Sequence, residues 1–325
     1  MPRLIEAEAQ EEEDDEITFV YMGGNQVVPD GVRRARIHKS VKIILRRAFQ
    51  YRRNLISVEF HDGVEVIEES AFHGCSLLSG SIKLLGIKII KTKAFYFCGG
   101  LADVEFGDKL ETIEQSAFCY CSTLRNITMP QVKSIDRYAF FSCRLLADLD
   151  LPEGLETLQE DAFWHCTRLR RIALPLKDDM IGNDVFNFCP NLTVVDLAGG
   201  IHKTVASLHH ESWRNEMTGE INRINQDLPN TDTQEKTQVI RRWMSAAISR
   251  LDHYIAEHHK LLKEATTLLE LALWKANLDN NKEGVVEREG VRTTRGQRKR
   301  ARKEISITSG ASIVIKNVLP FLELK

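Results

Sequence analysis

The stretch LADLDLPEGLETLQEDAFWHC, from Leu146 to Cys166, contains the pattern that decides the fold of this chain. Its Ala162-Phe163 pair is followed by Cys166, and the same arrangement returns along the sequence at intervals of 22 or 23 residues. Phenylalanine marks each copy: Phe49, Phe72, Phe95, Phe118, Phe140, Phe163 and Phe186. A fixed period of this length indicates one small unit stacked on copies of itself, and the extended surface of such a stack favours binding over catalysis.

Three further positions keep the period of the phenylalanine. Cysteine follows it by three residues in six copies, and Arg52 takes this place in the first: Cys75, Cys98, Cys121, Cys143, Cys166 and Cys189. Leucine follows it by six residues in all seven: Leu55, Leu78, Leu101, Leu124, Leu146, Leu169 and Leu192. An aliphatic residue precedes it by five: Ile44, Ile67, Ile90, Ile113, Ile135, Leu158 and Ile181. Because these positions stay in phase over seven copies, the repeat is not a chance pattern.

Each unit contains a short segment typical of a β-strand. The segment Leu55–Phe60 ends in alternating apolar residues, which predicts a strand with one buried face. Successive strands then form a parallel ladder at roughly 4.8 Å per level. No single unit can bury its apolar face alone, so only the stack is stable. The sequence therefore predicts a repeat solenoid.

The repeat resembles the leucine-rich repeats of the bacterial surface antigen type (BspA-like), whose pattern is L-x-x-I-x-L-P-x-x-L-x-x-I-x-x-x-A-F-x-x-C. The stretch Leu146–Cys166 matches this pattern best, and the resemblance covers about residues 27 to 200. It implies a right-handed coil with a parallel β ladder that binds proteins or other macromolecules. It implies no catalytic residues.

Two copies depart from the rest. In the second, Ser81 and Lys83 occupy core positions while Ile82 and Leu84 come one place late, which a β-bulge would explain. At the start, the segment from Val27 to Ile44 is read as a degenerate first coil, giving about eight coils in all. Its expected core is Val32, Ile37, Val41 and Ile44. We expect Phe49, near this end, to be packed on fewer sides than Phe118.

The sequence divides into five segments. Residues 1–16 form an acidic tail, with eight carboxylates between Glu6 and Glu16, for which a solvated disordered segment is the simpler interpretation. Residues 17–205 form the solenoid and residues 206–280 a helical module. Residues 281–304 form a basic flexible linker, and residues 305–325 a short apolar element.

The helical module is predicted to contain two helices. Apolar residues at spacings of three and four predict the first, with Ser207 as its N-cap and Pro229 after its end. They are Trp213, Met217, Ile221, Ile224 and Leu228. Thr231 or Asp232 could cap a second helix that runs to about Asn277.

The second helix carries a heptad pattern of apolar residues. The three lines are Ile240, Ala247, Tyr254, Leu261 and Leu268; Met244, Leu251, His258, Ala265 and Ala272; and Ile248, Ile255, Leu262 and Leu269. One interpretation is that the first helix and the solenoid end cover this face. The other is a coiled-coil-like stripe that meets a partner or a second copy of the chain.

The sequence contains no catalytic, cofactor-binding or metal-binding motif that we recognise. It lacks a phosphate loop, a nucleophile elbow and a zinc helix, and adjacent histidines on a helix point about 100° apart. We therefore expect a protein that is not an enzyme, has no cofactor and holds no metal. The N-terminus lacks an apolar leader and no stretch approaches the roughly 20 residues of a membrane span. A cytoplasmic or nuclear location with free, buried thiols follows as the expectation.

Two rows of side chains could bind an unknown protein partner. The first is a mainly acidic row on the outward face of the strands: Glu59, Asp103, Glu105, Asp148, Asp150 and Asp196. The second is an aromatic row two residues after the repeat phenylalanine, with Phe97, Tyr120 and Phe188 as its candidates. Aromatic rows favour interfaces, although either row could simply be a solvated or packed surface.

The function favoured by the sequence is therefore a non-catalytic protein-protein interaction scaffold. The alternative is a nuclear factor that associates with nucleic acid or another polyanion. It rests on a basic cluster typical of localisation signals and polyanion sites: Arg298, Lys299, Arg300, Arg302 and Lys303. A net charge of −2 provides no overall attraction to nucleic acid or membrane.

Overall fold

The computed structural model describes residues 18–200 and 211–286. Several expectations concern residues outside these ranges. They are the acidic tail 1–16, Ser207 as a helix cap, the basic cluster of Arg298 to Lys303 and the apolar element 305–325.

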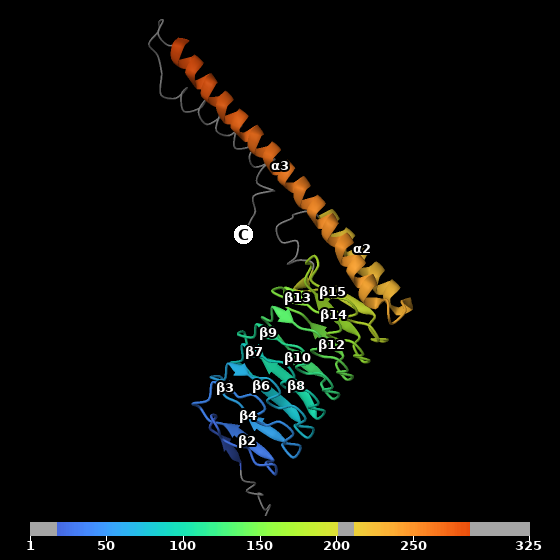
Figure 1. Cartoon of the computed structure of the whole chain (residues 1–325). Helices are drawn as coiled ribbons and strands as arrows, with labels where there is room; N and C mark the ends of the chain where they lie inside the picture. The colour runs from blue at the N-terminus through green and yellow to red at the C-terminus, as the bar shows by residue number, and fades with distance from the viewer. Residues whose placement is uncertain (1–17, 201–210, 287–325) are drawn as a thin grey trace, which may run out of the picture. The chain divides into compact units, whose positions relative to one another are not determined.

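The repeat region is a parallel β-solenoid with two strand ladders, and its successive turns change from blue to green along the stack in Figure 1. The long ladder is a row of three three-stranded sheets, which are β1 (Phe19–Tyr21), β2 (Arg34–Ile37) and β4 (Ser57–Glu59); β6 (Gly80–Leu84), β8 (Leu101–Phe106) and β10 (Asn126–Thr128); and β12 (Asp148–Asp150), β14 (Arg171–Leu174) and β15 (Val194–Leu197). The second ladder is one six-stranded sheet of two-residue strands: β3 (Ile43–Ile44), β5 (Val66–Ile67), β7 (Ile89–Ile90), β9 (Thr112–Ile113), β11 (Ser134–Ile135) and β13 (Thr157–Leu158). The fold class predicted from the repeat is confirmed.

The solenoid has seven complete turns, one for each repeat phenylalanine. The second ladder gives six levels, and a bridge between Leu158 and Ile181 adds the seventh. The predicted count of about eight is wrong because β2, β3 and Phe49 belong to one turn. The segment from Val27 to Ile44, expected to be a separate degenerate coil, is thus the first part of the turn that contains Phe49. Its expected core residues Val32, Ile37, Val41 and Ile44 are all buried.

The core is a continuous column of stacked phenylalanine rings. All seven rings are fully buried, and neighbouring centroids lie 4.8 to 6.1 Å apart with nearly parallel planes. Tyr21 of β1 continues the column at the N-terminal end, 5.1 Å from Phe49. The expectation that Phe49 is packed on fewer sides is therefore wrong.

The repeat cysteines form a second buried column of free thiols. Each Sγ donates a hydrogen bond to the carbonyl of the phenylalanine in the preceding turn, as Cys98 does to Phe72 at 3.1 Å. The same contact recurs for Cys75, Cys121, Cys143, Cys166 and Cys189. The cysteine side chain thus fills core volume and also satisfies a buried carbonyl.

The irregular second repeat contains the expected bulge. The pairing of β6 with β8 shifts register between Gly80 and Ser81. After the shift, Ile82 and Leu84 are buried while Ser81 and Lys83 are exposed. One extra residue therefore returns the apolar side chains to the core.

In the part of the chain that the structure describes after the solenoid, α2 (Glu211–Asp227), the short 3-10 turn η1 (Leu228–Asn230) and α3 (Lys236–Val286) follow one another. The first helix ends at Asp227, and Pro229 lies just after its end, as predicted. The second begins later than expected, because residues 231–235 form a turn in which the carbonyl of Thr233 accepts a hydrogen bond from Phe188. It also continues past the predicted end at Asn277.

The segment Ile221–Met244 forms one compact unit with the solenoid and closes its last turn. The side-chain amide of Asn225 forms the two hydrogen bonds that a neighbouring strand would form with Val195. Its Oδ1 accepts from Val195 N at 2.7 Å and its Nδ2 donates to Val195 O at 3.1 Å. Thr237 Oγ1 accepts from Phe186 N at 2.8 Å. Lys236 is buried and donates to the carbonyls of Pro190 and Leu192 at 3.0 and 2.5 Å. Backbone groups that an open strand edge would leave unpaired are satisfied here by side chains.

Replacing this buried lysine should loosen the cap. Lys236→Met keeps the aliphatic stem but removes the donor for two carbonyls, which should lower the free energy of unfolding by about 2–4 kcal/mol. Denaturant unfolding measures the loss. Lys260→Met, at an exposed position of α3, is the control and should leave the midpoint unchanged. Equal midpoints for both variants would contradict the capping role.

Candidate binding surfaces

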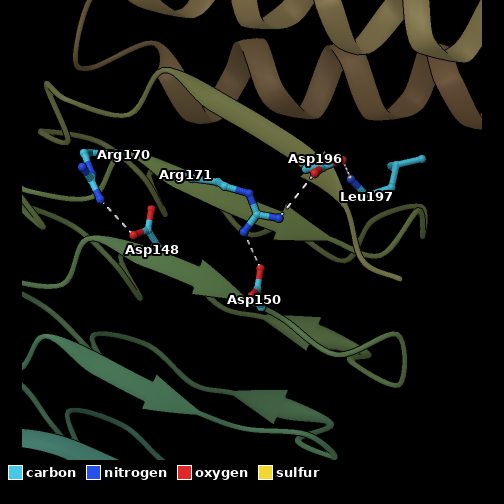
Figure 2. Close-up of polar contacts among 6 residues, drawn as sticks. All are labelled: Asp148, Asp150, Arg170, Arg171, Asp196 and Leu197. Atoms are coloured by element: carbon cyan, nitrogen blue, oxygen red, sulfur yellow. Dashed lines mark hydrogen bonds and ion pairs between the residues drawn. The ribbon is translucent and has the colours of Figure 1, made fainter. Parts of the chain in front are cut away.

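The outward face of the long ladder carries a network of ion pairs between neighbouring turns. Figure 2 shows its C-terminal part, where Arg170 contacts Asp148 at 3.0 Å. Arg171 bridges two turns, contacting Asp150 at 2.6 Å and Asp196 at 3.3 Å. These carboxylates provide hydrogen bonds and opposite charge that raise the pKa of the Arg171 guanidinium. Each carboxylate in this part of the row is matched by an arginine.

The remaining predicted acidic residues are also paired across turns. Asp103 accepts hydrogen bonds from Asn126 at 2.6 Å and from Ser81 at 3.2 Å. Glu105 lies 3.2 Å from Lys83, and Glu59 lies 2.5 Å from Arg36, whose hydrogen bond lowers the pKa of Glu59.

The acidic residues share one face, as the alternation of the strands predicts. A basic or amide side chain from an adjacent turn lies beside each of them, so the row is compensated within the solenoid. Their role in binding a partner stays a prediction.

The aromatic row lines a groove of about 480 Å3 on a different side of the turns. Tyr51, Phe97 and Tyr120 line this groove, with Arg53 and Arg144 also in its wall. The rings of Phe97 and Tyr120 are stacked, 4.6 Å apart and 4° from parallel. Tyr51 and Phe97 are about half exposed, at 53% and 47%. A stacked and accessible aromatic surface of this kind suits contact with another chain.

Phe188, the third predicted member of the aromatic row, does not line this groove. Its ring packs 4.8 Å from Trp164, and its amide is bound to Thr233 before α3. It contributes to closing the solenoid end.

The groove residues adopt a backbone conformation that large side chains rarely occupy. Tyr51, Phe97 and Tyr120 have φ values of 57°, 58° and 60°, in the left-handed region. That region costs a residue other than glycine roughly 1–2 kcal/mol. The equivalent position in the second turn is Gly74, over which the Tyr51 ring lies so closely that an added Cβ would be 2.6 Å from it. Glycine is thus compatible with this position, yet the chain carries exposed aromatic residues there.

A second aromatic line, which the sequence reading did not single out, stands one residue after the repeat phenylalanine. It includes His73, Tyr96, Phe141 and Trp164, with Phe141 and Trp164 stacked 4.6 Å apart. Burial lowers the pKa of His73, so this ring is mainly neutral at pH 7. The fixed offset from phenylalanine was the signal that could have revealed this line.

The heptad stripe of α3 is buried at its start and exposed further along. Ile240, Met244 and Ala247 are buried, whereas Leu261 and Leu268 are 38% and 53% exposed. Leu271, Leu273 and Trp274 nearby are exposed as well. Self-association through this stripe stays a prediction. Among the described helices, none is long and apolar enough to cross a membrane.

Comparisons with known proteins identify the repeat. The model of the "BspA type Leucine rich repeat region" matches with six copies over residues 31–131 and 88–215. Among solved structures, the chain is similar to a leucine-rich repeat protein of T. pallidum, with 29% identity, a TM-score of 0.37, and coverage of 41% of this chain and 63% of that one. A leucine-rich repeat protein from Bacteroides ovatus is 21% identical, with a TM-score of 0.35 and coverage of 55% and 60%. The chain thus spans about three fifths of the length of these two relatives. No curated protein matches the sequence at a significant level.

Proposed function

Because the chain belongs to the BspA-type leucine-rich repeat family, we propose that it is a non-catalytic scaffold whose aromatic groove binds an extended segment of a partner protein. The family is one of interaction scaffolds, and the groove adds a specific surface to that general role. The binding site consists of Tyr51, Phe97 and Tyr120 with the serines and arginines beside them.

The observation that carries this proposal is the exposure of aromatic rings at left-handed positions. Stability of the fold alone would favour glycine or a small polar residue there. Exposed aromatic side chains are instead typical of the residues that dominate binding energy at interfaces. Arg53 and Arg144 in the groove wall can bind carbonyl or carboxylate groups of the bound segment.

Glycine substitutions separate binding from folding at this site. In Phe97→Gly and Tyr120→Gly, relief of the left-handed strain and loss of the ring contact are each worth roughly 1 kcal/mol and should nearly cancel. Stability should therefore change little. Binding of a peptide selected from a displayed library on the immobilised protein should weaken at least about ten-fold, because each ring provides about 1–2 kcal/mol of contact.

The matched control is Lys93→Gly, which relieves a left-handed residue with φ of 57° in the same turn as Phe97 without removing an aromatic ring. It should leave peptide affinity unchanged. Titration of the labelled peptide by fluorescence polarisation, alongside thermal unfolding, gives both readouts. Unchanged affinity in both aromatic variants would show that the groove is not the binding site.

The acidic strand face is a second proposed surface for the same function. The polyanion alternative depends on the cluster Arg298, Lys299, Arg300, Arg302 and Lys303, outside the described residues. A steep linear fall of log affinity with log salt concentration would distinguish that alternative from peptide binding.

A further inference from the structure

A basic groove lies along the edge at which the strands of the long ladder begin. Its volume is about 890 Å3, and its lining includes Arg125, Leu145, Ala147, Asp148, Arg168 and Arg170. Arg125, Ala147 and Arg170 each directly precede a strand, in three consecutive turns. The small side chain of Ala147 leaves the space between two arginine positions that lie roughly 10 Å apart.

The groove carries guanidinium groups that the structure does not neutralise. Arg170 is paired with Asp148 at 3.0 Å, as Figure 2 shows. Within the described part of the chain, the exposed Arg125 and Arg168 side chains form no salt bridge. Leu145 and Ala147, both partly buried, provide a small apolar floor between them. Two free guanidinium groups beside an apolar floor fit a peptide that carries carboxylates among apolar residues.

We propose that the acidic segment of this same chain, residues 6–16, binds in the basic groove. The segment contains eight carboxylates, and Leu4, Ile5 and Ile17 flank it. Its route follows from the strand register. All strands of the long ladder are parallel, so their first residues lie along one edge. β1 begins at that same edge, on which the groove also lies.

The length of the segment is sufficient to span the distance. Counted along the chain order of the long-ladder strands, Arg125 and Arg170 stand five and seven levels from β1, which corresponds to roughly 24 to 34 Å. Nine extended residues, from Glu8 to Ile17, reach roughly 30 Å, before the arginine side chain is counted. Glu6 and Glu8 can therefore reach the far arginines, while the acidic run near Glu12 approaches Arg125.

The covalent link to β1 favours this occupant over a separate polyanion. A covalently attached segment needs only two or three contacts, because attachment gives it a high effective concentration. Occupied in this way, the groove would admit an acidic partner only after its own segment is displaced.

The test uses the full chain with two introduced cysteines as sites for spin labels. One is Glu8→Cys in the acidic segment, and the other is Asn191→Cys in the groove wall. The native cysteines are buried, so spin labels attach selectively to the introduced pair. Pulsed electron resonance should show a short, narrow distance between the labels. The reversals Arg125→Glu and Arg168→Glu should abolish the short-distance population, and raised salt should reduce it.

The matched control is the double reversal Lys42→Glu and Lys109→Glu, which changes the net charge equally at exposed positions outside the groove. It should preserve the short distance. A peptide of residues 4–17 should displace the labelled segment, whereas the same peptide with Gln and Asn in place of Glu and Asp should not. The proposal would be overturned if the distance distribution stayed the same in the Arg125→Glu and Arg168→Glu variant. It would also be overturned if the control variant changed the distribution by the same amount. Displacement by a DNA oligonucleotide but not by the acidic peptide would likewise overturn it and would indicate a nucleic-acid site.

Discussion

The solenoid should unfold cooperatively when the pH is raised from about 8.5 to about 11. Burial raises the pKa of Cys75 and Cys189 to about 12, and it raises the pKa of the other four repeat thiols as well. In the unfolded chain a thiol has a pKa of about 8.5. The folded state therefore binds more protons than the unfolded state at alkaline pH.

The sign follows from proton linkage. Each thiol contributes its full stability below pH of about 8.5 and loses it as the pH rises toward the folded pKa. Each contributes a slope of about 1.4 kcal/mol per pH unit, so six repeat thiols together approach about 8 kcal/mol per unit. A domain is stable by only about 5–15 kcal/mol. A pH that is one to two units above about 8.5, the thiol pKa in the unfolded chain, should therefore suffice to unfold the solenoid.

Denaturant unfolding at a series of pH values checks this expectation. Cys143→Ala removes one thiol, and its stability should fall with pH less steeply than that of the wild type, by about 1.4 kcal/mol per unit. The slope is informative even if the variant is less stable at neutral pH. At neutral pH the native thiols should resist labelling and react only after unfolding. Stability independent of pH up to 11, or rapid labelling of several native thiols, would contradict a buried thiol column.

Phe118→Ala should lower the free energy of unfolding by about 3–5 kcal/mol. The ring is fully buried and stacked between Phe95 and Phe140, with centroids 5.1 and 5.3 Å away. Rigid turns on both sides prevent collapse into the space that the ring leaves. Chemical unfolding measures the loss, and Phe118→Leu, which retains most of the volume, should cost much less.

Phe49→Ala should be nearly as costly, because Tyr21 covers the side of Phe49 that the repeat leaves open. Tyr21→Ala combined with Phe49→Ala tests this coupling, since residues in contact lose stability non-additively. A negligible loss for Phe118→Ala would mean that the ring column does not hold the stack together.

The solenoid could be predicted because its information is repeated. The phenylalanine recurs at the same position in seven copies, and this phase locates the core residues and the strands beside them. It also reveals the register shift at Ser81, where the apolar residues come one place late. The alternation of side chains along a strand likewise predicted that Asp148 and Asp150 lie on the outer face.

The binding surfaces were less accessible to sequence reasoning because they depend on relations between turns. Arg171 contacts Asp150 and Asp196 only because register brings residues 21 and 25 positions apart together. The basic groove depends on the absence of a large side chain at Ala147, which no motif records. The cap was missed for a similar reason: Asn225 and Lys236 act on the backbone of the last turn rather than on any side chain that a pattern could pair with them.

The cap also bears on how the chain could change its length. Among the described residues, Asn225, Lys236 and Thr237 form their hydrogen bonds to the solenoid in the final turn, and the Tyr21 ring stacks on the first repeat phenylalanine. The turns between are therefore exchangeable modules with fixed end pieces. Duplication or deletion of one whole 23-residue module, as from Phe72 to Phe95, would leave both end pieces seated. A change by a length far from one whole turn of 22 or 23 residues would set every following ring, thiol and strand out of phase, so this architecture grows or shrinks in whole turns.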